Sequence, residues 1–241
     1  MTLTIEQFTC KQPFYENAYF IMNPDTKDLA LVDPGDGAAE KTHEFIKKGY
    51  NFTQIILTHV HIDHTWDLPK LREEFSEIPV IMHEGDRFWA ENYQIFQNMF
   101  GLDNFGEFPA IDTLTFVNEG DKINISGEEL TVIHVPGHSA GHIALYHGSA
   151  KIDFPEGNIK VEGEGEGFCV VGDVIFKKNV GRTDLHGGDG QTLMNTIKNK
   201  IFALPGETIL YNGHGEETTV EFEKKHNYMV GDNADGSFIF W

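Results

Sequence analysis

Three histidines and one aspartate fall within six consecutive residues, which read His59-Val60-His61-Ile62-Asp63-His64. His59 and His61 share one side of an extended segment because alternate residues point the same way, whereas Asp63 and His64 come after the turn that follows. Imidazole nitrogens and carboxylate oxygens are ligands that suit zinc, iron or manganese. The cluster follows an apolar run, so it predicts that one loop at the end of a strand contributes ligands to two adjacent metal ions.

Three further residues with metal-binding side chains share this layout, because each comes just after an apolar run and beside a glycine: His138, Asp173 and His214. With the first four they provide enough ligands for two divalent ions, with positions left open for water, if Asp173 bridges the pair. Two metal ions about 3.5–4 Å apart lower the pKa of a shared water and stabilise a developing oxyanion. The spacing therefore predicts a two-metal hydrolytic site in which Asp63 and Asp173 act in catalysis, with Asp63 orienting the hydroxide.

Short strands and helices in two similar halves must position these residues. Strands are expected at Leu3–Phe8, Ala18–Met22, Leu29–Val32, Gln54–Leu57, Val80–Met82, Leu114–Val117, Lys122–Ile125, Leu130–His134, Ile143–Tyr146, Phe168–Val171 and Thr208–Tyr211. Helices are expected at Ala38–Lys48, Asp86–Phe100, Gln191–Phe202 and Val220–His226, and after Asp67, which can cap a helix that carries Leu68, Leu71 and Phe75. This order predicts an α+β protein, a four-layer αβ/βα sandwich in one domain over 1–241. The Gly- and Glu-rich segment 151–167 is expected to be an exposed hairpin insertion.

Charge and cysteine content limit the classes of partner. The formal net charge of -20 repels phosphate backbones and anionic lipid headgroups, so we expect a small-molecule substrate and neither nucleic acid nor a membrane as partner. The first ten residues lack a basic segment followed by an apolar run, which argues against a secretory signal. Only Cys10 and Cys169 are present, which fits a reducing compartment and predicts a cytoplasmic protein of unspecified oligomeric state.

The ordered motifs resemble those of the metallo-β-lactamase superfamily over nearly the whole chain. They are Thr58-His59-Val60-His61-Ile62-Asp63-His64, Pro136-Gly137-His138-Ser139-Ala140-Gly141-His142, Gly172-Asp173 and Gly213-His214-Gly215. The resemblance implies a first metal ion bound by His59, His61 and His138. It implies a second bound by Asp63, His64 and His214, with Asp173 binding both. It also implies the four-layer sandwich, with the site at one edge of the sheets.

Details of these motifs discriminate between branches of the superfamily. Asp173 stands where many true β-lactamases have a cysteine, which argues against antibiotic hydrolysis. His61 stands where flavodiiron proteins usually have a glutamate, which argues against that branch. The segment Gly181-Arg182-Thr183-Asp184 is similar to an element of short glyoxalase II-like hydrolases and of persulfide dioxygenases. The dioxygenases use a single iron and typically have a cysteine where Val180 stands. Longer glyoxalase II enzymes hold glutathione with a helical C-terminal domain, for which the chain after His214 is too short.

The resemblance to the short hydrolases implies a dinuclear metal-dependent hydrolase that cleaves a thioester, such as an S-acylglutathione, by a metal-bound hydroxide. Zinc is the expected metal, with iron or manganese as alternatives. A mononuclear-iron persulfide dioxygenase, a lactonase and a non-catalytic metal-binding protein remain alternative functions. Arg182 is assigned either to a substrate carboxylate or to a nearby carboxylate that holds its loop. Asp184 is expected to orient a ligand histidine, and His142 to be structural.

Overall fold

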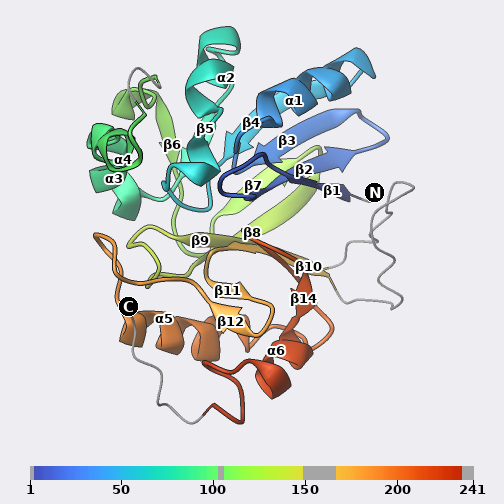
Figure 1. The fold of residues 1–241 in the computed structure, drawn as a ribbon. Helices are drawn as coiled ribbons and strands as arrows, with labels where there is room; N and C mark the ends of the chain where they lie inside the picture. Colours follow the sequence, from blue (N-terminus) through green and yellow to red (C-terminus); the bar gives the residue numbers. More distant parts are fainter. Residues whose placement is uncertain (1–2, 103–105, 149–166, 235–241) are drawn as a thin grey trace.

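Two β-sheets packed face to face form the centre of the protein (Figure 1). The computed structural model describes residues 3–102, 106–148 and 167–234. The first sheet has the order β1-β2-β3-β4-β5-β6, with bounds Thr4–Thr9, Asn17–Asn23, Asp28–Val32, Asn51–Ile56, Val80–Met82 and Leu114–Phe116. The second has the order β14-β13-β10-β9-β8-β7, with bounds Thr218–Thr219, Ile209–Asn212, Phe168–Gly172, Ile143–His147, Glu128–His134 and Lys122–Ile125. Both sheets are mixed, because β3 to β6 pair in parallel in the first sheet and β10 pairs in parallel with β13 in the second.

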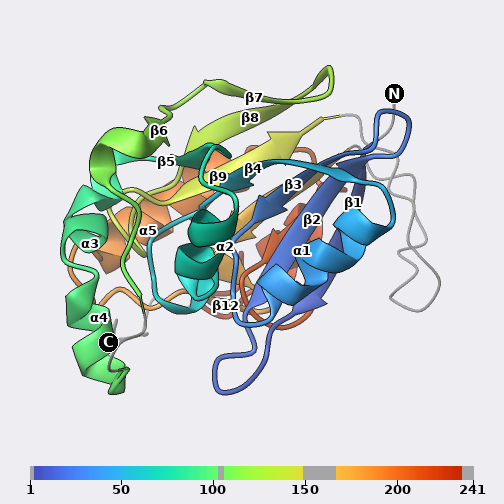
Figure 2. The ribbon, with the colours of Figure 1, turned by 90° about the horizontal axis from the view of Figure 1, so that it is seen from above.

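Helices cover the outer face of each sheet. The first sheet carries α1, α2, α3 and α4, with bounds Ala38–Lys47, Leu68–Glu74, Arg87–Glu91 and Gln94–Phe100. The second carries α5 and α6, with bounds Gly190–Thr196 and Val220–His226. Figure 2 shows α1 and α2 lying over the first sheet when the molecule is seen from above, with α3 and α4 at one side. The predicted four-layer sandwich of helices, sheet, sheet and helices is therefore confirmed.

The alternation of side chains along β2 shows why the sheets are buried on both faces. All seven residues of β2 are buried. Phe20 and Met22 pack into the cluster under α1 to α4, whereas Tyr19 and Ile21 pack into the cluster between the sheets. Successive strand residues point to opposite faces, so the part of β2 that is covered on both sides, Ala18 to Met22, is continuously apolar.

The aromatic segment that precedes Phe100 does not form the single predicted helix. A 3-10 turn over Glu84–Asp86 leads into α3, and the helix then breaks before α4 begins at Gln94. At the break, the hydroxyl of Tyr93 contacts the Thr65 hydroxyl at 2.9 Å and donates to the Thr65 carbonyl at 3.2 Å. The buried contact to the loop before α2 accounts for the change of direction, which periodicity alone does not reveal.

Asp67 caps a different helix from the predicted one. Its carboxylate makes no capping bond to α2, which begins at the next residue. It accepts instead from the N–H groups of Gly37 at 3.0 Å and Ala39 at 2.8 Å. These are free donors at the start of α1, where Gly37 has φ +97° and no side chain to provide a cap. The bond ties the loop after β4 to α1.

The remaining predicted segments have mixed outcomes. The predicted helix at Gln191–Phe202 corresponds to α5 and a π-helical continuation over Ile197–Ile201. The predicted hairpin over 151–167 lies outside the described residues except for Gly167. A small antiparallel pair, β11 at Ile175–Phe176 and β12 at Asn179–Val180, follows β10. Within the described ranges, every helix is too short or too polar to cross a bilayer.

Candidate metal centre

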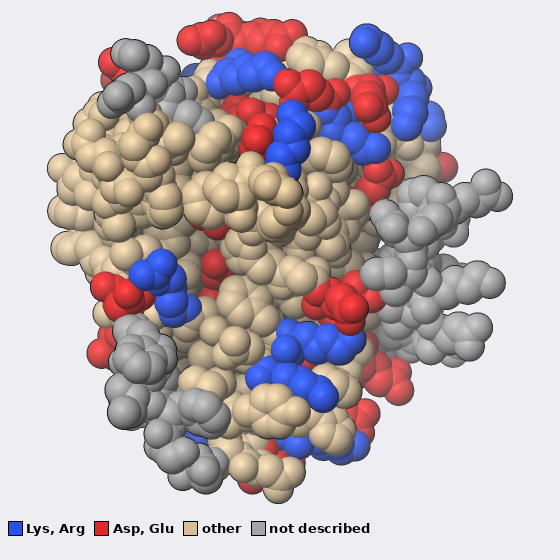
Figure 3. Space-filling view, viewed as in Figure 1, with Lys and Arg blue, Asp and Glu red and all other residues tan. Residues whose placement is uncertain are grey.

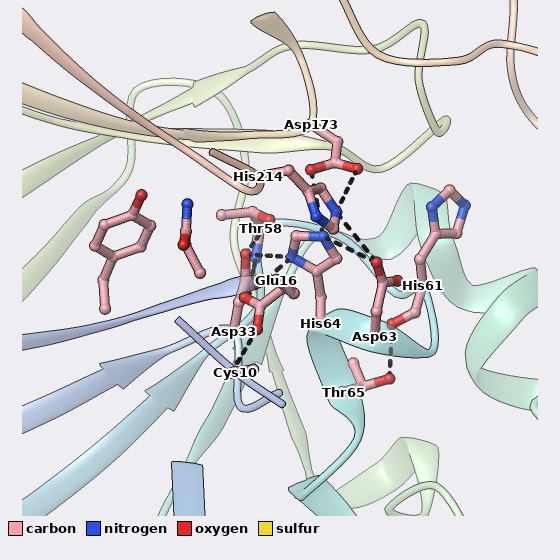
Figure 4. A network of polar contacts seen from close by, with 12 residues as sticks. Cys10, Glu16, Asp33, Thr58, His61, Asp63, His64, Thr65, Asp173 and His214 are labelled. Carbon is pink, nitrogen blue, oxygen red and sulfur yellow. Dashed lines mark hydrogen bonds and ion pairs between the residues drawn. The ribbon is translucent and has the colours of Figure 1, made fainter. Parts of the chain in front are cut away.

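The seven predicted ligands lie at strand ends that meet at one edge of the two sheets. His59, His61, Asp63 and His64 follow β4 in the first sheet, and the loop closes in a 3-10 turn over Asp63–Thr65. The other three come from the second sheet, where they follow β8, β10 and β13: His138, Asp173 and His214. Figure 4 shows side chains from both sheets directed toward one another. The site therefore requires both halves of the sandwich.

Three histidines form a buried group. His138 Nε2 lies 3.2 Å from His59 Nε2 and 2.9 Å from His61 Nδ1. The three side chains are at most 5% exposed. Ligand atoms about 2.0–2.1 Å from a tetrahedral zinc ion lie about 3.4 Å apart, so these three nitrogens are close to the separation that one such ion requires.

A second group lies beside the first and is more open. His214 Nε2 lies 3.2 Å from Asp63 Oδ2, and His64 Nε2 lies 3.8 Å from the same oxygen. The side chain of His64 is fully buried, whereas His214 is 30% and Asp63 is 16% exposed. Solvent therefore reaches the centre on the side of His214. Figure 3 shows acidic atoms inside a hollow between the two halves, with uncharged surface around it.

Asp173 lies between the two groups. Its Oδ1 is 3.3 Å from His64 Nε2, and its Oδ2 is 3.5 Å from His214 Nε2. The same Oδ2 is 3.7 Å from His138 Nε2 in the three-histidine group. One carboxylate thus faces ligand atoms of both groups, which is the geometry of a bridging ligand.

The hydrogen bonds on the far sides of the imidazoles show that the site fits metal ions. His138 Nδ1 donates to the Arg182 carbonyl at 2.7 Å. Thr58 Oγ donates to Asp33 at 2.6 Å and so accepts from His59 Nδ1 at 3.0 Å. With both Nδ1 atoms protonated, the Nε2 atoms of neutral His59 and His138 face each other with lone pairs. A cation between them satisfies both.

Two further buried atoms in the centre point to the same conclusion. His64 Nε2 and Asp173 Oδ1 lie 3.3 Å apart without the alignment of a hydrogen bond, and neither makes a hydrogen bond elsewhere in the described part of the chain. Buried polar atoms are rarely left without a partner. Both belong to the predicted ligand set, and a divalent ion at the centre would complete them.

Asp33 positions one histidine of each group, His64 directly (Figure 4) and His59 through Thr58. Its carboxylate is buried and accepts from Thr58 N–H at 2.7 Å, from the Thr58 hydroxyl and from His64 Nδ1 at 3.0 Å. His64 is thereby held with Nε2 toward the metal position, while Thr58 relays the same orientation to His59. In the sequence, Asp33 begins the turn-forming run Asp33-Pro34-Gly35-Asp36-Gly37, and the only signal for a role at the site is its place at the end of a buried strand.

Glu16 is a second buried carboxyl group behind His64. Its Oε2 accepts from the Cys10 thiol at 3.0 Å, and its Oε1 lies 3.6 Å from His64 Nδ1. Burial raises the pKa of Glu16 well above its ordinary value, although the positive charge of His64 opposes the shift. A Cβ at Gly35 would lie 2.0 Å from Glu16 Oε2, so only glycine lets the turn after β3 approach this group.

The two ligand groups differ in charge when they hold no metal. Burial and the neighbouring histidines lower the pKa values of His59 and His61 well below the ordinary value, so these rings are neutral ligands. Burial also opposes the charged form of His64, but the carboxylates of Asp173 and Asp63 outweigh it and raise its pKa. Burial likewise opposes charge on His214, yet its hydrogen bonds to Asp173 and Asp63 raise its pKa to about 10. The two histidines of the second group therefore hold their protons more tightly than an ordinary histidine does, and a metal ion that binds there must displace these protons.

The Gly-Arg-Thr-Asp element holds His138 through its backbone. A Cβ at Gly181 would lie 1.8 Å from the Asp173 carbonyl oxygen, so the glycine permits this segment to pack against the site. The Arg182 guanidinium forms two hydrogen bonds with Asp184, at 2.6 and 2.7 Å. The expectation that the Asp184 carboxylate orients a ligand histidine is therefore wrong, because the Arg182 carbonyl does so.

Two more predicted residue roles concern packing. His142 is buried, its ring stacks on His59 at 4.6 Å, and its Nε2 accepts from Asp173 N–H at 3.1 Å. Its structural role therefore supports the site directly. Trp89 and Phe96 stack on each other at 4.1 Å and are buried, and both also contact the ring of His61.

Comparison with known proteins gives consistent matches. Residues 12–155 match the Metallo-beta-lactamase superfamily. The chain is 32% identical to "Probable metallo-hydrolase YqgX" of Bacillus subtilis over 216 residues, which are 89% of this chain and 92% of that protein. It is 32% identical to "Hydroxyacylglutathione hydrolase GloC" of Haemophilus influenzae over 222 residues, which are 92% and 95% of the two chains.

Two solved structures are similar to this chain in both sequence and fold. The BLEG-1 B3 metallo-beta-lactamase superposes with a TM-score of 0.76 at 30% identity, covering 94% of this chain and 99% of that one. TTHA1623, solved in a di-iron-bound form, superposes with a TM-score of 0.72 at 31% identity, covering 92% and 98%. The matches extend over both halves of the sandwich and so include the strands that carry the ligands.

Proposed function

The chain belongs to the metallo-β-lactamase superfamily, and we propose that it is a metal-dependent hydrolase that cleaves a thioester, such as an S-acylglutathione, at a dinuclear centre. The observation that carries the proposal is the position of Asp173 between two groups of metal-binding side chains. The similarity to GloC, whose name describes hydrolysis of hydroxyacylglutathione, supports the choice of substrate class.

The residues divide into two ligand sets. One set is His59, His61 and His138, and the other is Asp63, His64 and His214, with Asp173 shared between them. Two bound divalent ions would activate a water molecule and stabilise the negative charge that develops on the thioester carbonyl oxygen. We propose zinc, although the same nitrogen and oxygen donors accept iron, which the related TTHA1623 binds as a pair.

Residues on the open side of the centre orient the reactants. Asp63 is the more exposed of the two catalytic aspartates that we propose, and its carboxylate can accept a hydrogen bond from the attacking water. His214 borders the same opening, with the ring of Phe176 at 5.9 Å. We assign Arg182 to a carboxylate of the substrate, which its exposed guanidinium would contact by exchanging with Asp184.

The test combines metal content with turnover. Protein purified without chelators should contain about two metal ions per chain by elemental mass spectrometry, and should hydrolyse S-lactoylglutathione. Two bound metals without hydrolysis of any thioester, lactone or other ester would contradict the proposed activity.

Two other activities are measured in the same preparation. One iron per chain and oxygen uptake with glutathione persulfide would identify a dioxygenase, which the 181–184 segment also resembles. Hydrolysis of a chromogenic cephalosporin tests a β-lactamase activity, for which the similarity to BLEG-1 is the specific observation. We expect no turnover with either substrate.

A further inference from the structure

We propose that Asp86 is a positioning residue that holds the ligand loops of the two sheets in register, so that their histidines converge on one metal ion. The inference rests on the metal centre of the proposed function. It adds a residue outside the ligand motifs, in a segment predicted to be part of an aromatic helix.

Asp86 contacts both ligand loops at once. It is the last residue of the 3-10 turn after β5, and it is 1% exposed. Its Oδ2 accepts from Val60 N–H at 3.1 Å and from the Ser139 hydroxyl at 2.8 Å. Its Oδ1 accepts from Gly141 N–H at 2.6 Å. One side chain therefore joins the loop after β4 to the loop after β8, across the boundary between the sheets.

The donors adjoin the ligands directly. Val60 lies between His59 and His61, and Ser139 follows His138. These are the three histidines whose nitrogens converge at 2.9–3.2 Å. A metal site needs its ligands held within about 0.5 Å of the binding geometry. Because the histidines come from different sheets, a bond between their loops controls this convergence.

The backbone of the Asp86 turn packs directly against the ligand loop after β8. A Cβ at Gly141 would lie 2.3 Å from the Asp86 backbone nitrogen, and a Cβ at Gly85 would lie 2.7 Å from the Ala140 carbonyl oxygen. Neither glycine has a φ in the left-handed region, so close approach is the reason for glycine at both positions. The turn after β5 and the turn after His138 are thus in direct contact.

The chemistry at this position requires a carboxylate. A carboxylate accepts at both oxygens, so it can satisfy the two backbone N–H groups and the hydroxyl simultaneously. In Asp86→Asn the side chain has nearly the same size, but one oxygen becomes an NH₂ group that meets a backbone N–H with another donor. In either orientation of the amide, the NH₂ group faces the backbone N–H of Gly141 or that of Val60, so the variant weakens the link between the loops while it preserves the packing.

The experiment measures zinc affinity by competition with a chromophoric chelator, and separately the thermal midpoint of the metal-free protein. Changes to groups that orient metal ligands typically weaken binding by about 10–100-fold, and we expect Asp86→Asn to fall in this range. Ser139→Ala removes one of the three contacts and should weaken binding less. Ser139→Thr, which retains a hydroxyl, should restore part of the loss.

Glu223 provides a matched control. It is also a buried carboxylate that accepts three hydrogen bonds, from the Thr218 hydroxyl, Lys178 N–H and the Asn227 side chain. Its donors adjoin none of the proposed ligands. Glu223→Gln should therefore lower the thermal midpoint of the metal-free protein while zinc affinity stays at the wild-type value.

The outcomes separate positioning from plain structural support. Weaker zinc binding in Asp86→Asn than in Glu223→Gln, at a comparable midpoint, supports the proposal. Wild-type affinity in Asp86→Asn overturns it. Should Asp86→Asn not fold, wild-type affinity in Ser139→Ala overturns it instead. Wild-type protein that binds no zinc, iron or manganese would contradict the proposed function, independently of the variants.

Discussion

Replacing Asp33 by asparagine should weaken metal binding at both ligand groups, because it reverses the hydrogen bonds that orient His64 and His59. In the wild type, the Asp33 carboxylate accepts from His64 Nδ1 and from the Thr58 hydroxyl, which in turn accepts from His59 Nδ1. In Asp33→Asn, an NH₂ group at Oδ2 donates instead. His64 Nδ1 must then become an acceptor and its proton moves to Nε2, the proposed ligand atom. The Thr58 hydroxyl is likewise free to donate to His59 Nδ1, with the same consequence.

The expected loss of metal affinity depends on the number of hydrogen bonds between Asp33 and each ligand histidine. Partners that orient metal-bound histidines change metal affinity by about 10–100-fold, or about 1.4–2.7 kcal/mol. His64 donates a hydrogen bond to Asp33 directly, so we expect about a 100-fold loss of metal affinity in the second group. His59 is reached through Thr58, so we expect about a tenfold loss in the first. The metal-free protein should also lose about 1–3 kcal/mol of its free energy of unfolding, because buried donors lose their acceptor.

The assay is a zinc titration against a competing chelator, with nitrogen NMR of the imidazoles to report the protonated atom. Thr58→Val is the matched variant, because it removes only the relay to His59 and should weaken the first group alone. Thr58→Ser retains the hydroxyl and should bind zinc as the wild type does. Two zinc ions at wild-type affinity in Asp33→Asn, with His64 still protonated at Nδ1, would refute the reasoning.

Three further predictions concern the ligands and the substrate. Asp173→Ala should remove metal binding and turnover together, because the Asp173 carboxylate faces both ligand groups. Retained turnover with unchanged metal content would contradict the assignment of the seven ligands. Arg182→Ala should raise KM for S-lactoylglutathione several-fold and leave KM for S-acetyl-N-acetylcysteamine, which has no carboxylate, unchanged; equal effects on both would assign Arg182 to its loop. Removing metal with EDTA should lower the thermal midpoint, since an ion present at about 1,000 times its Kd stabilises the fold by about 4.1 kcal/mol, and an unchanged midpoint would indicate that the centre holds no metal in the native protein.

The metal ligands could be predicted from the sequence because the pattern that identifies them is local. His59, His61, Asp63 and His64 lie within one loop, and period-two alternation places the first two on one side. The longer strands were equally predictable, since a buried strand such as β2 is apolar at every position from Ala18 to Met22. The break before α4 was not predictable in this way, because it depends on a contact between Tyr93 and Thr65, which are 28 residues apart.

The groups that position the ligands were missed for the same physical reason. Asp33, Asp67 and Asp86 read locally as a turn residue, the cap of the next helix and part of an aromatic helix. Each instead accepts from backbone N–H groups at least 25 residues away. A buried carboxylate is tolerated only when donors surround it, and here folding brings those donors from several loops. If the seven ligands were transferred to another sheet edge, they would therefore lack the hydrogen bonds that set their tautomers and spacing. Asp33 and Asp86, together with their donors, are for this reason part of the site.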